Sequence, residues 1–469
     1  MNPVSTAVAT AAVALILPVV ARAAEPPPAE AALSPIPAAL PAIADAVSPA
    51  ALRATIEKLV SFGTRHTLSE TRSDKRGIGA ARRWVAAEFG RIGQACGGCL
   101  DIVTPSDVVT GKRVPTPTEV VNVLAIQRGS REPNRVVIIA GHLDSRVSEV
   151  MNFKSDAPGA NDDASGVAAA IEAARVLSKH RFGATLVYAA LSGEEQGLLG
   201  GKILADYAKA QGWQVVADLN NDIVGNSTGQ DGVTDTTTVR VLSEGTRRTE
   251  TPEQARQRGY NGGEVDSPSR NIARYMARLA DENLSNFRVQ MIYRTDRYAR
   301  GGDQVPLLEA GYPAVRVSEP HEHYHRQHQD LRTENGVTFG DTIDGVDFDY
   351  LAQVTRLNAI TMASMAAAPA PPSGVEIEGA VTPDTVVKWK PVTGAAGYRV
   401  WWRDTTAPQW QHSRRVGADA TSTKLANIVI DNWFFGVSSI STDGAESPVV
   451  FPGFVGSFDA PVAAAAGTN

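Results

Sequence analysis

The sequence predicts a three-layer α/β/α domain, doubly wound around a mostly parallel sheet, with a small all-β sandwich after it. Two almost wholly apolar runs, Arg135–Ala140 and Thr185–Leu191, have the length and composition of strands buried in a parallel sheet. Between them, Ser165–Lys179 places its apolar residues on one helical face, so that strand and helix alternate. Beyond residue 375 apolar and polar residues alternate, which indicates a separate all-β domain.

The N-terminal segment has the pattern of an export signal. The apolar stretch Ala11–Val20 is too short to span a bilayer, and Ala21-Arg22-Ala23 fits a small-x-small cleavage site. No Lys or Arg precedes the stretch, which departs from the usual pattern. We expect a signal peptide at 1–23, a periplasmic or secreted protein, and no membrane span in the rest of the chain. The Ala/Pro-rich residues 24–48 are expected to be an unfolded spacer.

The composition is that of ordinary globular protein. The 469 residues carry a net charge of −6, and nothing marks the chain as a nucleic-acid binder. The two cysteines, Cys96 and Cys99, are too few for a cysteine zinc site, and we expect a small loop disulfide formed in an oxidising compartment. A redox-active pair is the alternative, although Gly-Gly between the sulfurs favours a turn.

The domain boundaries follow from changes in composition. Residues 49–366 are expected to form the α/β domain, 367–374 a proline-stiffened linker, 375–453 the β-sandwich and 454–469 a disordered tail. In the α/β domain we further expect helices at Ala51–Leu59, Ile78–Phe89 and Phe348–Ala366, and strands at Gln214–Leu219 and Pro313–Val317. Residues 226–266, rich in Gly, Thr, Asp and Arg, are expected to be an insertion or a flexible lid.

The C-terminal region resembles a fibronectin type III domain. Its expected strands are Thr385–Trp389, Tyr398–Arg403 and Phe434–Ser441. Trp389 and Tyr398 stand where that fold packs its core, and Phe434 or Phe435 stands in the place of its usual tyrosine.

Two roles are open for this C-terminal region. It would dock to a surface or a polymer if Trp401, Trp402 and Trp410 form an exposed cluster. Otherwise it is a spacer or a stabilising appendage.

Histidines and carboxylates follow the expected strands of the α/β domain. His142 comes directly after the first strand, Glu194 and Glu195 come after the second, and Asp222 comes after the third. Ligands bind at the carboxyl ends of parallel strands, so these residues should meet at one edge of the sheet. Together with the histidine-rich run His321–Asp330, they offer the nitrogen and oxygen donors that zinc accepts.

Four motifs carry these residues and the aspartates between them. They are Gly141-His-Leu-Asp-Ser145, Pro158-Gly-Ala-Asn-Asp-Asp-Ala-Ser-Gly166, Ser192-Gly-Glu-Glu-Gln-Gly197 and Asn220-Asn-Asp-Ile223. In motifs and spacing, most of Val60–Ala366 resembles the M28 family of di-zinc exopeptidases. The resemblance is specific because all the motifs occur together, and it implies a peptidase with two zinc ions.

The resemblance implies a set of zinc ligands. His142 and Asp222 would bind one zinc, Glu195 would bind the other, and Asp162 would bridge both. The closing histidine is expected to be His328, because His328-Gln-Asp-Leu-Arg-Thr-Glu-Asn-Gly336 is similar to the tail motif of bacterial members. His325 is the competing choice.

The resemblance also implies catalytic and supporting roles. Glu194 would be the general base that moves a proton from water to the leaving amine. Asp144 is expected to hydrogen-bond the second imidazole nitrogen of His142 and fix its tautomer. Asp163 is expected to be structural. Asp303 is a candidate for supporting the site, although Gln304 replaces the histidine that the family often has there.

Each site residue also has an ordinary structural interpretation. A histidine at a strand end is more often a satisfied polar residue than a ligand, and paired aspartates often cap a helix. Glu194 and Glu195 could form a solvated turn, and Asp222 could be a loop acid. All of these interpretations would have to be true at the same time, for residues that stand in the order of the family's motifs. They therefore receive little weight. His66, His180 and His412, outside the motifs, are expected to be structural or surface residues.

The expected function is an exported di-zinc aminopeptidase that acts on peptides. One alternative is a carboxypeptidase or dipeptidase of the same superfamily, and another is a one-zinc enzyme of the glutaminyl cyclase type. A non-catalytic adhesion or receptor ectodomain is the alternative from a different class. Zinc, cobalt and manganese are all open as the working metal, since similar sites accept several.

Overall fold

The computed structural model describes Met1 and residues 35–459. The predicted signal peptide (1–23) lies outside the described residues except for Met1, and so do the start of the predicted spacer and residues 460–469 of the predicted tail. Within the described residues, no helix combines the length and the apolarity that crossing a membrane requires.

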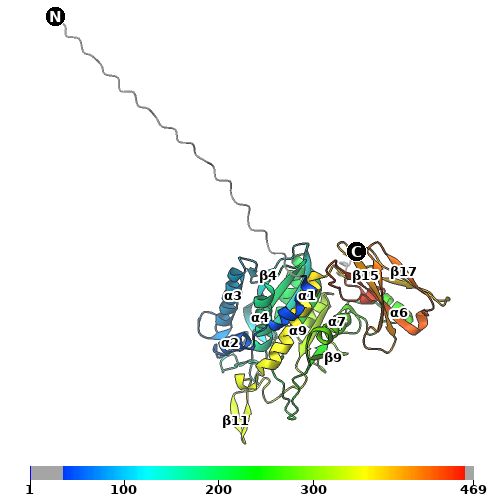
Figure 1. The fold of residues 1–469 in the computed structure, drawn as a ribbon. Coiled ribbons are helices and arrows are strands. Elements are labelled where there is room, and N and C mark those ends of the chain that lie inside the picture. The colour runs from blue at the N-terminus through cyan, green and yellow to red at the C-terminus, as the bar shows by residue number, and fades with distance from the viewer. Residues whose placement is uncertain (2–34, 460–469) are drawn as a thin grey trace, which may run out of the picture. The chain divides into compact units, whose positions relative to one another are not determined.

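A mixed sheet of eight strands forms the centre of residues 35–459 (Figure 1). In spatial order its strands are β1 (Asp101–Val103), β4 (Val123–Gln127), β6 (Ala184–Leu191), β5 (Glu132–His142), β7 (Gln214–Asn221), β10 (Ala314–Ser318), β8 (Thr238–Leu242) and β9 (Arg288–Ile292). The central strands β6, β5, β7 and β10 run parallel, whereas β1, β4 and β8 pair antiparallel with their inner neighbours. The predicted mostly parallel sheet is confirmed at its centre.

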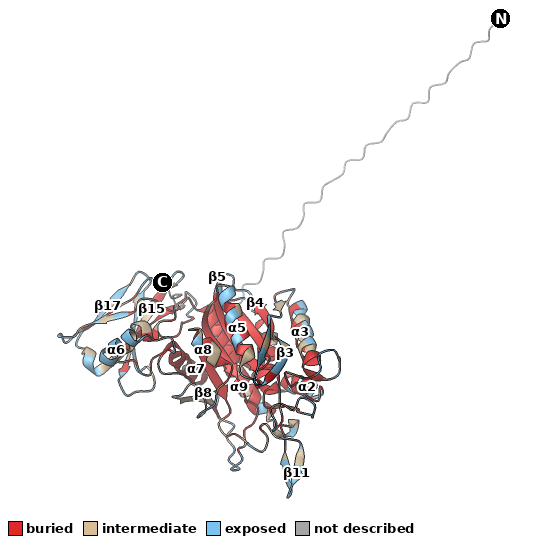
Figure 2. Cartoon of the chain, turned by 180° about the vertical axis from the view of Figure 1, so that it is seen from behind, coloured by how far each residue is buried: buried red, intermediate tan, exposed pale blue. Residues whose placement is uncertain are grey.

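Helices cover both faces of this sheet. One face carries α1 (Ile36–Asp45), α2 (Pro49–Val60), α3 (Gly77–Ala95), α4 (Ala164–Leu177), α7 (Pro268–Asn283) and α9 (Phe348–Ala367). The other face, seen in Figure 2, carries α5 (Leu199–Ala210) and α8 (Gln304–Glu309). On β5, Val137 and Ile139 belong to the first core, and Val136 and Ile138 belong to the second. Successive side chains of a strand point to opposite faces, so both faces are buried, as the sequence predicted.

The predicted spacer is partly folded. Residues 36–45 form α1 instead of an unfolded segment, and this helix packs against α9. Its apolar residues Ile36, Leu40 and Ile43 are buried. They recur at the spacing of one helical face, and a face that cannot fold alone becomes stable when another helix covers it.

The segment 226–266 is not a flexible lid. It contains β8, whose Val239 and Val241 are fully buried in the central sheet. It also contains α6 (Pro252–Asn261), which has no buried residue. The polar composition of the whole segment concealed the short alternating strand inside it.

Two hairpins lie outside the central sheet. β2 (Ser106–Gly111) pairs with β3 (Val114–Val121), and β11 (Arg332–Glu334) pairs with β12 (Val337–Phe339). The β11–β12 hairpin extends away from the body in Figure 1 and is followed by the short 3₁₀ helix η1 (Ile343–Gly345).

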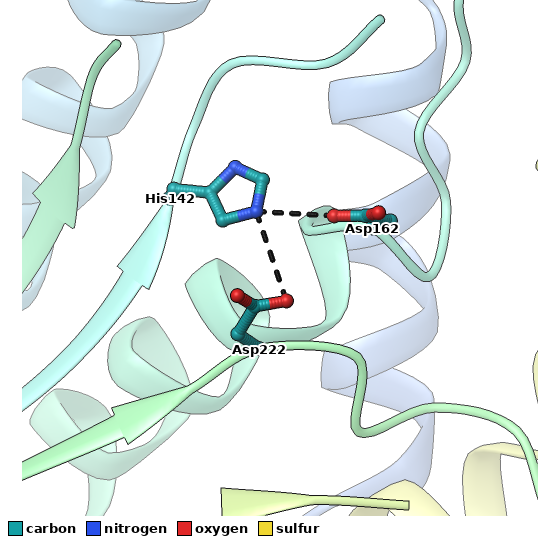
Figure 3. Close-up of side chains that lie close together, drawn as sticks. All are labelled: His142, Asp162 and Asp222. Atoms are coloured by element: carbon teal, nitrogen blue, oxygen red, sulfur yellow. Dashed lines mark ion pairs between the residues drawn. The ribbon is translucent and has the colours of Figure 1, made fainter. Parts of the chain in front are cut away.

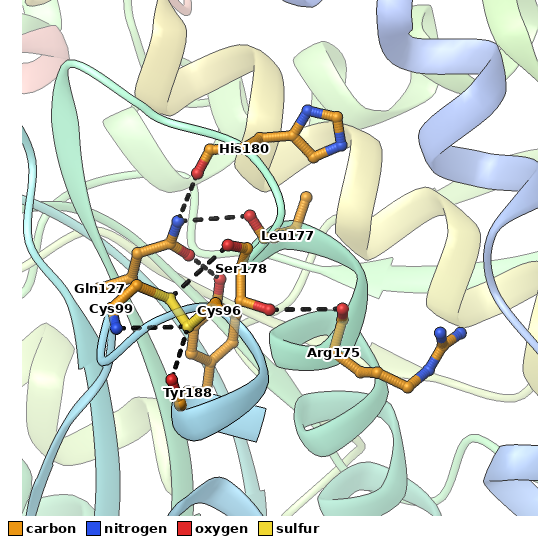
Figure 4. Close-up of a disulfide and its surroundings, with 9 residues drawn as sticks. Cys96, Cys99, Gln127, Arg175, Leu177, Ser178, His180 and Tyr188 are labelled. Carbon is orange, nitrogen blue, oxygen red and sulfur yellow. Dashed lines mark hydrogen bonds between the residues drawn. A yellow bond between two sulfur atoms is a disulfide. The ribbon is translucent and has the colours of Figure 1, made fainter. Parts of the chain in front are cut away.

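The two cysteines form the expected disulfide. Cys96 and Cys99 close the turn after α3, with their Cα atoms 5.6 Å apart. Cys99 Sγ lies 3.6 Å from the carbonyl oxygen of Ser178, the residue that follows α4 (Figure 4). The bridge therefore sits between the C-terminal ends of two neighbouring helices.

The C-terminal region forms two three-stranded antiparallel sheets. One contains β13 (Glu376–Glu378), β14 (Thr385–Lys388) and β17 (Ser422–Leu425), and the other contains β16 (His412–Gly417), β15 (Gly397–Asp404) and β18 (Trp433–Ile440). Trp389 and Tyr398 are buried with ring centroids 5.3 Å apart, so they belong to its core as predicted. The all-β architecture agrees with the sequence, and the fibronectin type III assignment stays a prediction.

The segments before and after the β-sandwich pack against the rest of the protein more than the sequence predicted. Most residues of the predicted linker 367–374 are buried. Residues 454–456 form the 3₁₀ helix η3, and Phe458 is buried, so the predicted disordered tail is wrong for residues 454–459. Apolar side chains at Phe454, Val455 and Phe458 give this short segment a surface to pack.

A buried ion network joins the β-sandwich to the α/β domain. Arg403 on β15 donates to both carboxylate oxygens of Asp266, over 2.8 and 3.0 Å. Arg274 on α7 donates to the same carboxylate over 2.9 Å. None of the three side chains is more than 2% exposed. Because a buried charge is stable only when it is paired, this network requires both domains to be in place.

The three tryptophans do not form an exposed cluster. Trp401 is buried, and Trp410 donates its indole N–H to Asn271 on α7. Trp402 stacks on His412 within the sandwich. Two of the three side chains therefore lie at the boundary with α7 or in the core, which favours a stabilising appendage over a docking surface.

We predict that Asp266→Asn destabilises the whole chain. The substitution leaves two buried guanidiniums without their carboxylate, which costs about 3–5 kcal/mol in comparable buried pairs. Urea unfolding followed by circular dichroism measures this loss. The control is Glu378→Gln, because Glu378 pairs with Lys388 on the surface of the sandwich, and breaking such a pair costs less than about 1 kcal/mol. Equal stabilities of the two variants would contradict the prediction.

Candidate metal centre

The order of the central strands brings the predicted residues to one edge. His142 is the last residue of β5, Glu194 and Glu195 follow β6, and Asp222 follows β7. The registers pair His142 with Leu191 and Ala140 with Asn220, so His142 and Asp222 end their strands at the same level. This is the carboxyl edge of the parallel strands, where α/β proteins bind their ligands.

One group of ligand atoms comes from His142, Asp162 and Asp222 (Figure 3). His142 Nε2 lies 3.0 Å from Asp162 Oδ1 and 3.8 Å from Asp222 Oδ1. One ligand atom from each of the three residues lies within 4.8 Å of the others, and all three residues are buried.

A second group comes from Asp162, Glu195 and His328. His328 Nε2 lies 3.0 Å from Asp162 Oδ2 and 3.0 Å from Glu195 Oε1. Asp162 thus belongs to both groups, and each of its carboxylate oxygens faces a different imidazole. A carboxylate in this position has the geometry that bridging two neighbouring cations requires.

The electrostatics of both groups fit bound cations. Burial lowers the pKa of His328, but the carboxylates of Glu195 and Asp162 raise it to about 10. The pKa of His142 is likewise raised well above its ordinary value by Asp162 and Asp222, against the effect of burial. Glu195 Oε1 is buried and accepts no hydrogen bond from the described residues. Two imidazole nitrogens and three carboxylates are a donor set that zinc accepts.

Backbone strain concentrates around these groups. His328, Ile223 and Leu198 all have φ between 49 and 63°, in the left-handed region. Ile223 directly follows Asp222, and a β-branched residue is rare in that conformation. Such conformations cost about 1–3 kcal/mol each and persist where the surroundings hold the backbone in place, often at functional sites.

The carboxylate of Asp144 holds the segment that carries the two glutamates. It accepts hydrogen bonds from the backbone N–H groups of residues 193–195, over 2.8, 3.2 and 3.2 Å. The Thr67 hydroxyl donates to the same carboxylate over 2.9 Å. Asp144 is therefore placed to position Glu194 and Glu195 through their main chain.

This differs from the role expected for Asp144. Its carboxylate lies 3.7 Å from Nδ1 of His142, beyond hydrogen-bonding distance. The backbone carbonyl oxygen of Asp144 lies 3.0 Å from that nitrogen instead. The tautomer of His142 is therefore fixed by the main chain of Asp144, because the loop turns the side chain towards residues 193–195.

Asp163 has the structural role that the sequence predicted. Its carboxylate accepts from the backbone N–H of His142 over 2.9 Å and caps α4 through the N–H of Gly166 over 3.0 Å. Burial raises the pKa of Asp163 well above its ordinary value. The peptide bond between Asp162 and Asp163 is cis.

A cavity of about 310 Å³ opens over both groups, and Glu194 is one of the residues that line it. Burial raises the pKa of Glu194 well above its ordinary value, and the carboxylates of Glu195 and Asp222 raise it further. A half-buried glutamate with a raised pKa beside the ligand groups can exchange a proton with a molecule in the cavity.

Two further residues, not predicted from the sequence, support the ligands. Arg316, in the middle of β10, places Nη1 2.7 Å from Asp222 Oδ2. Asp341 accepts from the backbone N–H of Asp162 over 2.7 Å. A charged residue inside an apolar strand was a detectable signal for Arg316. Asp341 lies in a loop with no pattern that marks it.

Comparisons with known proteins identify the family of this chain. A model of peptidase family M28 matches residues 122–346. The probable zinc metalloprotease of Pyrenophora teres f. teres is 45% identical over 423 residues, which cover 88% of this chain and 86% of the relative. That of Leptosphaeria maculans is 46% identical over 419 residues, which cover 88% and 96%. The chain belongs to peptidase family M28.

A similar fold is also found among solved structures. The LapA aminopeptidase of Legionella pneumophila matches with a TM-score of 0.51 at 19% identity, over 71% of this chain and 75% of that one. The prediction that the chain is a peptidase of this family is thereby confirmed in its family and its fold.

In this M28 peptidase the predicted ligands lie close together, and only one of the two candidate histidines contacts them. His328 reaches both Asp162 and Glu195. His325 turns away, with Nε2 3.0 Å from Gln230 Nε2 and its ring 4.6 Å from that of Phe339. The geometry favours His328 as the closing residue.

The remaining predicted residues lie outside the two groups. Asp303 is buried and accepts from the backbone N–H of Gly201 on α5, and burial raises its pKa to about 7. Gln304 donates to Asp296, which pairs with Arg316 and so connects to Asp222.

The three histidines outside the motifs agree with the structural or surface roles expected of them. His66 is fully buried, with Nε2 3.1 Å from Gln196 Nε2. The ring of His180 lies near Phe182, and that of His412 lies near Trp402.

We predict that Asp144→Asn weakens both catalysis and metal binding. The amide places N–H donors against the backbone N–H groups of 193–195, which displaces Glu194 and Glu195. Such supporting substitutions reduce metal affinity or activity by about 10–100-fold. The measurements are zinc titration with a competing chelator and steady-state kinetics.

Asp101→Asn is the matched control, because Asp101 pairs with Arg128 on the surface of the sheet edge. Unchanged zinc affinity and turnover in Asp144→Asn would show that the carboxylate does not hold the glutamate segment in place.

Proposed function

We propose that this M28 peptidase is an exported di-zinc aminopeptidase. His142, Asp162 and Asp222 would hold one cation, and Asp162, Glu195 and His328 would hold the other. The observation that carries the proposal is the position of Asp162, whose two oxygens each lie 3.0 Å from a different imidazole nitrogen. The names of the relatives, which are probable zinc metalloproteases, support zinc as the metal.

The reaction would be hydrolysis of the first peptide bond of a peptide with a free amino terminus. Two cations in these groups supply activation of water and polarisation of the scissile carbonyl. Glu194 takes a proton from the attacking water and delivers it to the departing amine. Asp144 keeps Glu194 at the cavity through the backbone of 193–195. Arg316 holds the carboxylate of Asp222 in its place.

We further propose that the protein is exported and that its C-terminal domain is of the fibronectin type III kind. The apolar segment followed by Ala21-Arg22-Ala23 and the disulfide between Cys96 and Cys99 support a periplasmic or secreted location. Two small antiparallel sheets with a buried Trp389–Tyr398 pair support a fibronectin type III-like domain.

The test of the function is hydrolysis of amino-acid p-nitroanilides by the zinc-loaded protein. We expect turnover of substrates with a free amine and none of their N-acetyl derivatives. Glu194→Gln should reduce kcat by about 10²–10⁴-fold with zinc content unchanged, because it removes only the proton carrier. Cleavage of N-acetyl peptides from their carboxyl end would instead identify a carboxypeptidase. Ammonia release from a peptide with N-terminal Gln would identify a glutaminyl cyclase.

We predict that His328→Ala removes one of the two cations. Zinc per chain, measured by mass spectrometry after gel filtration, should fall from two to one, because the second group loses its only imidazole. His325→Ala is the matched control from the same loop and should keep both. A full zinc complement in His328→Ala, or a loss in His325→Ala, would refute the ligand assignment.

A further inference from the structure

Four arginines line the cavity above the two ligand groups. They are Arg113 from the β2–β3 turn, Arg146 from the loop after β5, and Arg297 and Arg300 from the loop before α8. They come from three separate loops, and none of the four arginines is part of the four motifs of the ligands. Among the described residues that line the cavity, these are the cations that do not belong to the proposed zinc ligands.

Every carboxylate that lines the cavity already has a role in the proposed function, either as a metal ligand or as the general base. The carboxylates that line it are those of Asp162, Glu194, Glu195 and Asp222. Two divalent cations would balance these four negative charges. Of the four guanidiniums, Arg297 and Arg300 share Glu322, and the positive charge that is left makes the cavity attractive to an anion.

Neighbouring residues hold Arg113 and Arg146 against the glutamate ligand. Arg113 donates to the backbone carbonyl of Glu195 over 2.9 Å. Arg146 Nη1 lies 3.9 Å from Glu195 Oε2, and its other nitrogens donate to the backbone carbonyls of Val147 and Ser148. These two guanidiniums therefore border the second ligand group directly.

Arg297 and Arg300 share one carboxylate. Glu322 Oε2 lies 3.3 Å from Arg297 Nη1 and 3.4 Å from Arg300 Nη1, and Arg240 binds the other oxygen of Glu322. Burial raises the pKa of Glu322, but Arg297 and Arg240 lower it by more. Arg297 also pairs with Asp296 over 3.3 Å, but Asp296 is shared with Arg316, so these two carboxylates do not neutralise all the guanidiniums around them. Arg300, whose side chain is 35% exposed, keeps hydrogen-bonding capacity for a ligand.

The cavity offers little to a large apolar group. Leu198 is the one hydrophobic side chain among the described residues that line it, and the other uncharged lining residues are Gly197 and Gly301. Sites that select apolar side chains are lined mainly by hydrophobic and aromatic residues. This composition therefore favours a polar, negatively charged substrate group.

We propose that the arginine-lined cavity selects peptide substrates that carry a carboxylate next to the scissile bond. The inference rests on the proposed function and adds the chemical class of its substrate. Guanidinium groups bind carboxylates through paired hydrogen bonds, and loops that already hold the arginines lose little conformational entropy on binding. The carboxylate would come from an acidic side chain or from the carboxyl terminus of a dipeptide.

The kinetic experiment has one arm for each source. In the first arm, glutamyl p-nitroanilide is compared with glutaminyl p-nitroanilide, which differs only in the side-chain charge. In the second arm, Leu-Gly is compared with Leu-Gly amide. We expect kcat/KM to favour the carboxylate in at least one arm by about 10–100-fold, the range for a hydrogen bond to a charged group.

Variants connect the preference to the arginines. Arg300→Gln should lose most of the preference for the carboxylate while turnover of the neutral substrate changes little. Arg294→Gln is the matched control, because Arg294 lies in the same loop over the ring of Tyr298 and does not line the cavity. The control removes the same charge and should keep the preference.

A binding measurement separates this inference from the proposed function. Calorimetry of the zinc-loaded protein should show glutarate binding about 10-fold tighter than its monoamide, with the difference reduced in Arg300→Gln. Each ligand keeps one carboxylate for the metal, so the difference reports the second carboxylate.

Equal binding of the two ligands, or equal kcat/KM in both kinetic arms, would overturn the inference and leave the peptidase assignment intact. Preferential binding of glutarate without hydrolysis of any peptide would overturn the function and leave the anion site intact.

Discussion

The site depends on one buried carboxylate that faces two imidazoles. Asp162 can occupy this position because its backbone N–H donates to Asp341 and because Asp163 beside it caps α4 and binds the main chain of His142. Every partner in this arrangement is itself buried or held by hydrogen bonds. A loosely held aspartate could not keep its two oxygens at 3.0 Å from two nitrogens, one at the end of β5 and the other in the loop before β11.

The parallel centre of the sheet provides the frame for that carboxylate. Adjacent parallel strands end at the same edge, and their registers set His142 level with Asp222 and close to the segment after β6. The apolar side chains of these strands fill two cores, which fix the positions of the strands. Arg316 brings a guanidinium from inside β10 to Asp222.

The β-sandwich also stabilises the α/β domain. Asp266 lies between Arg274 of the α/β domain and Arg403 of the sandwich, and neither guanidinium is more than 2% exposed. Separating the two domains would leave these buried charges without their partners. The α/β domain and the sandwich are therefore expected to unfold together. The position of Trp401 and Trp410 beside α7 agrees with this structural role.

Local sequence patterns were enough to predict the α/β class, the central strands and the residues that follow them, because apolar periodicity and strand ends are local features. The sequence also indicated His142, Glu195 and Asp222 as neighbours, since parallel strands end together. Only the tertiary structure separated His328 from His325, turned the Asp144 carboxylate to the glutamate segment, and folded α1 against α9. It alone gathered Arg113, Arg146 and Arg300 around one cavity. These features depend on contacts between loops far apart in the chain, and no local pattern records such contacts.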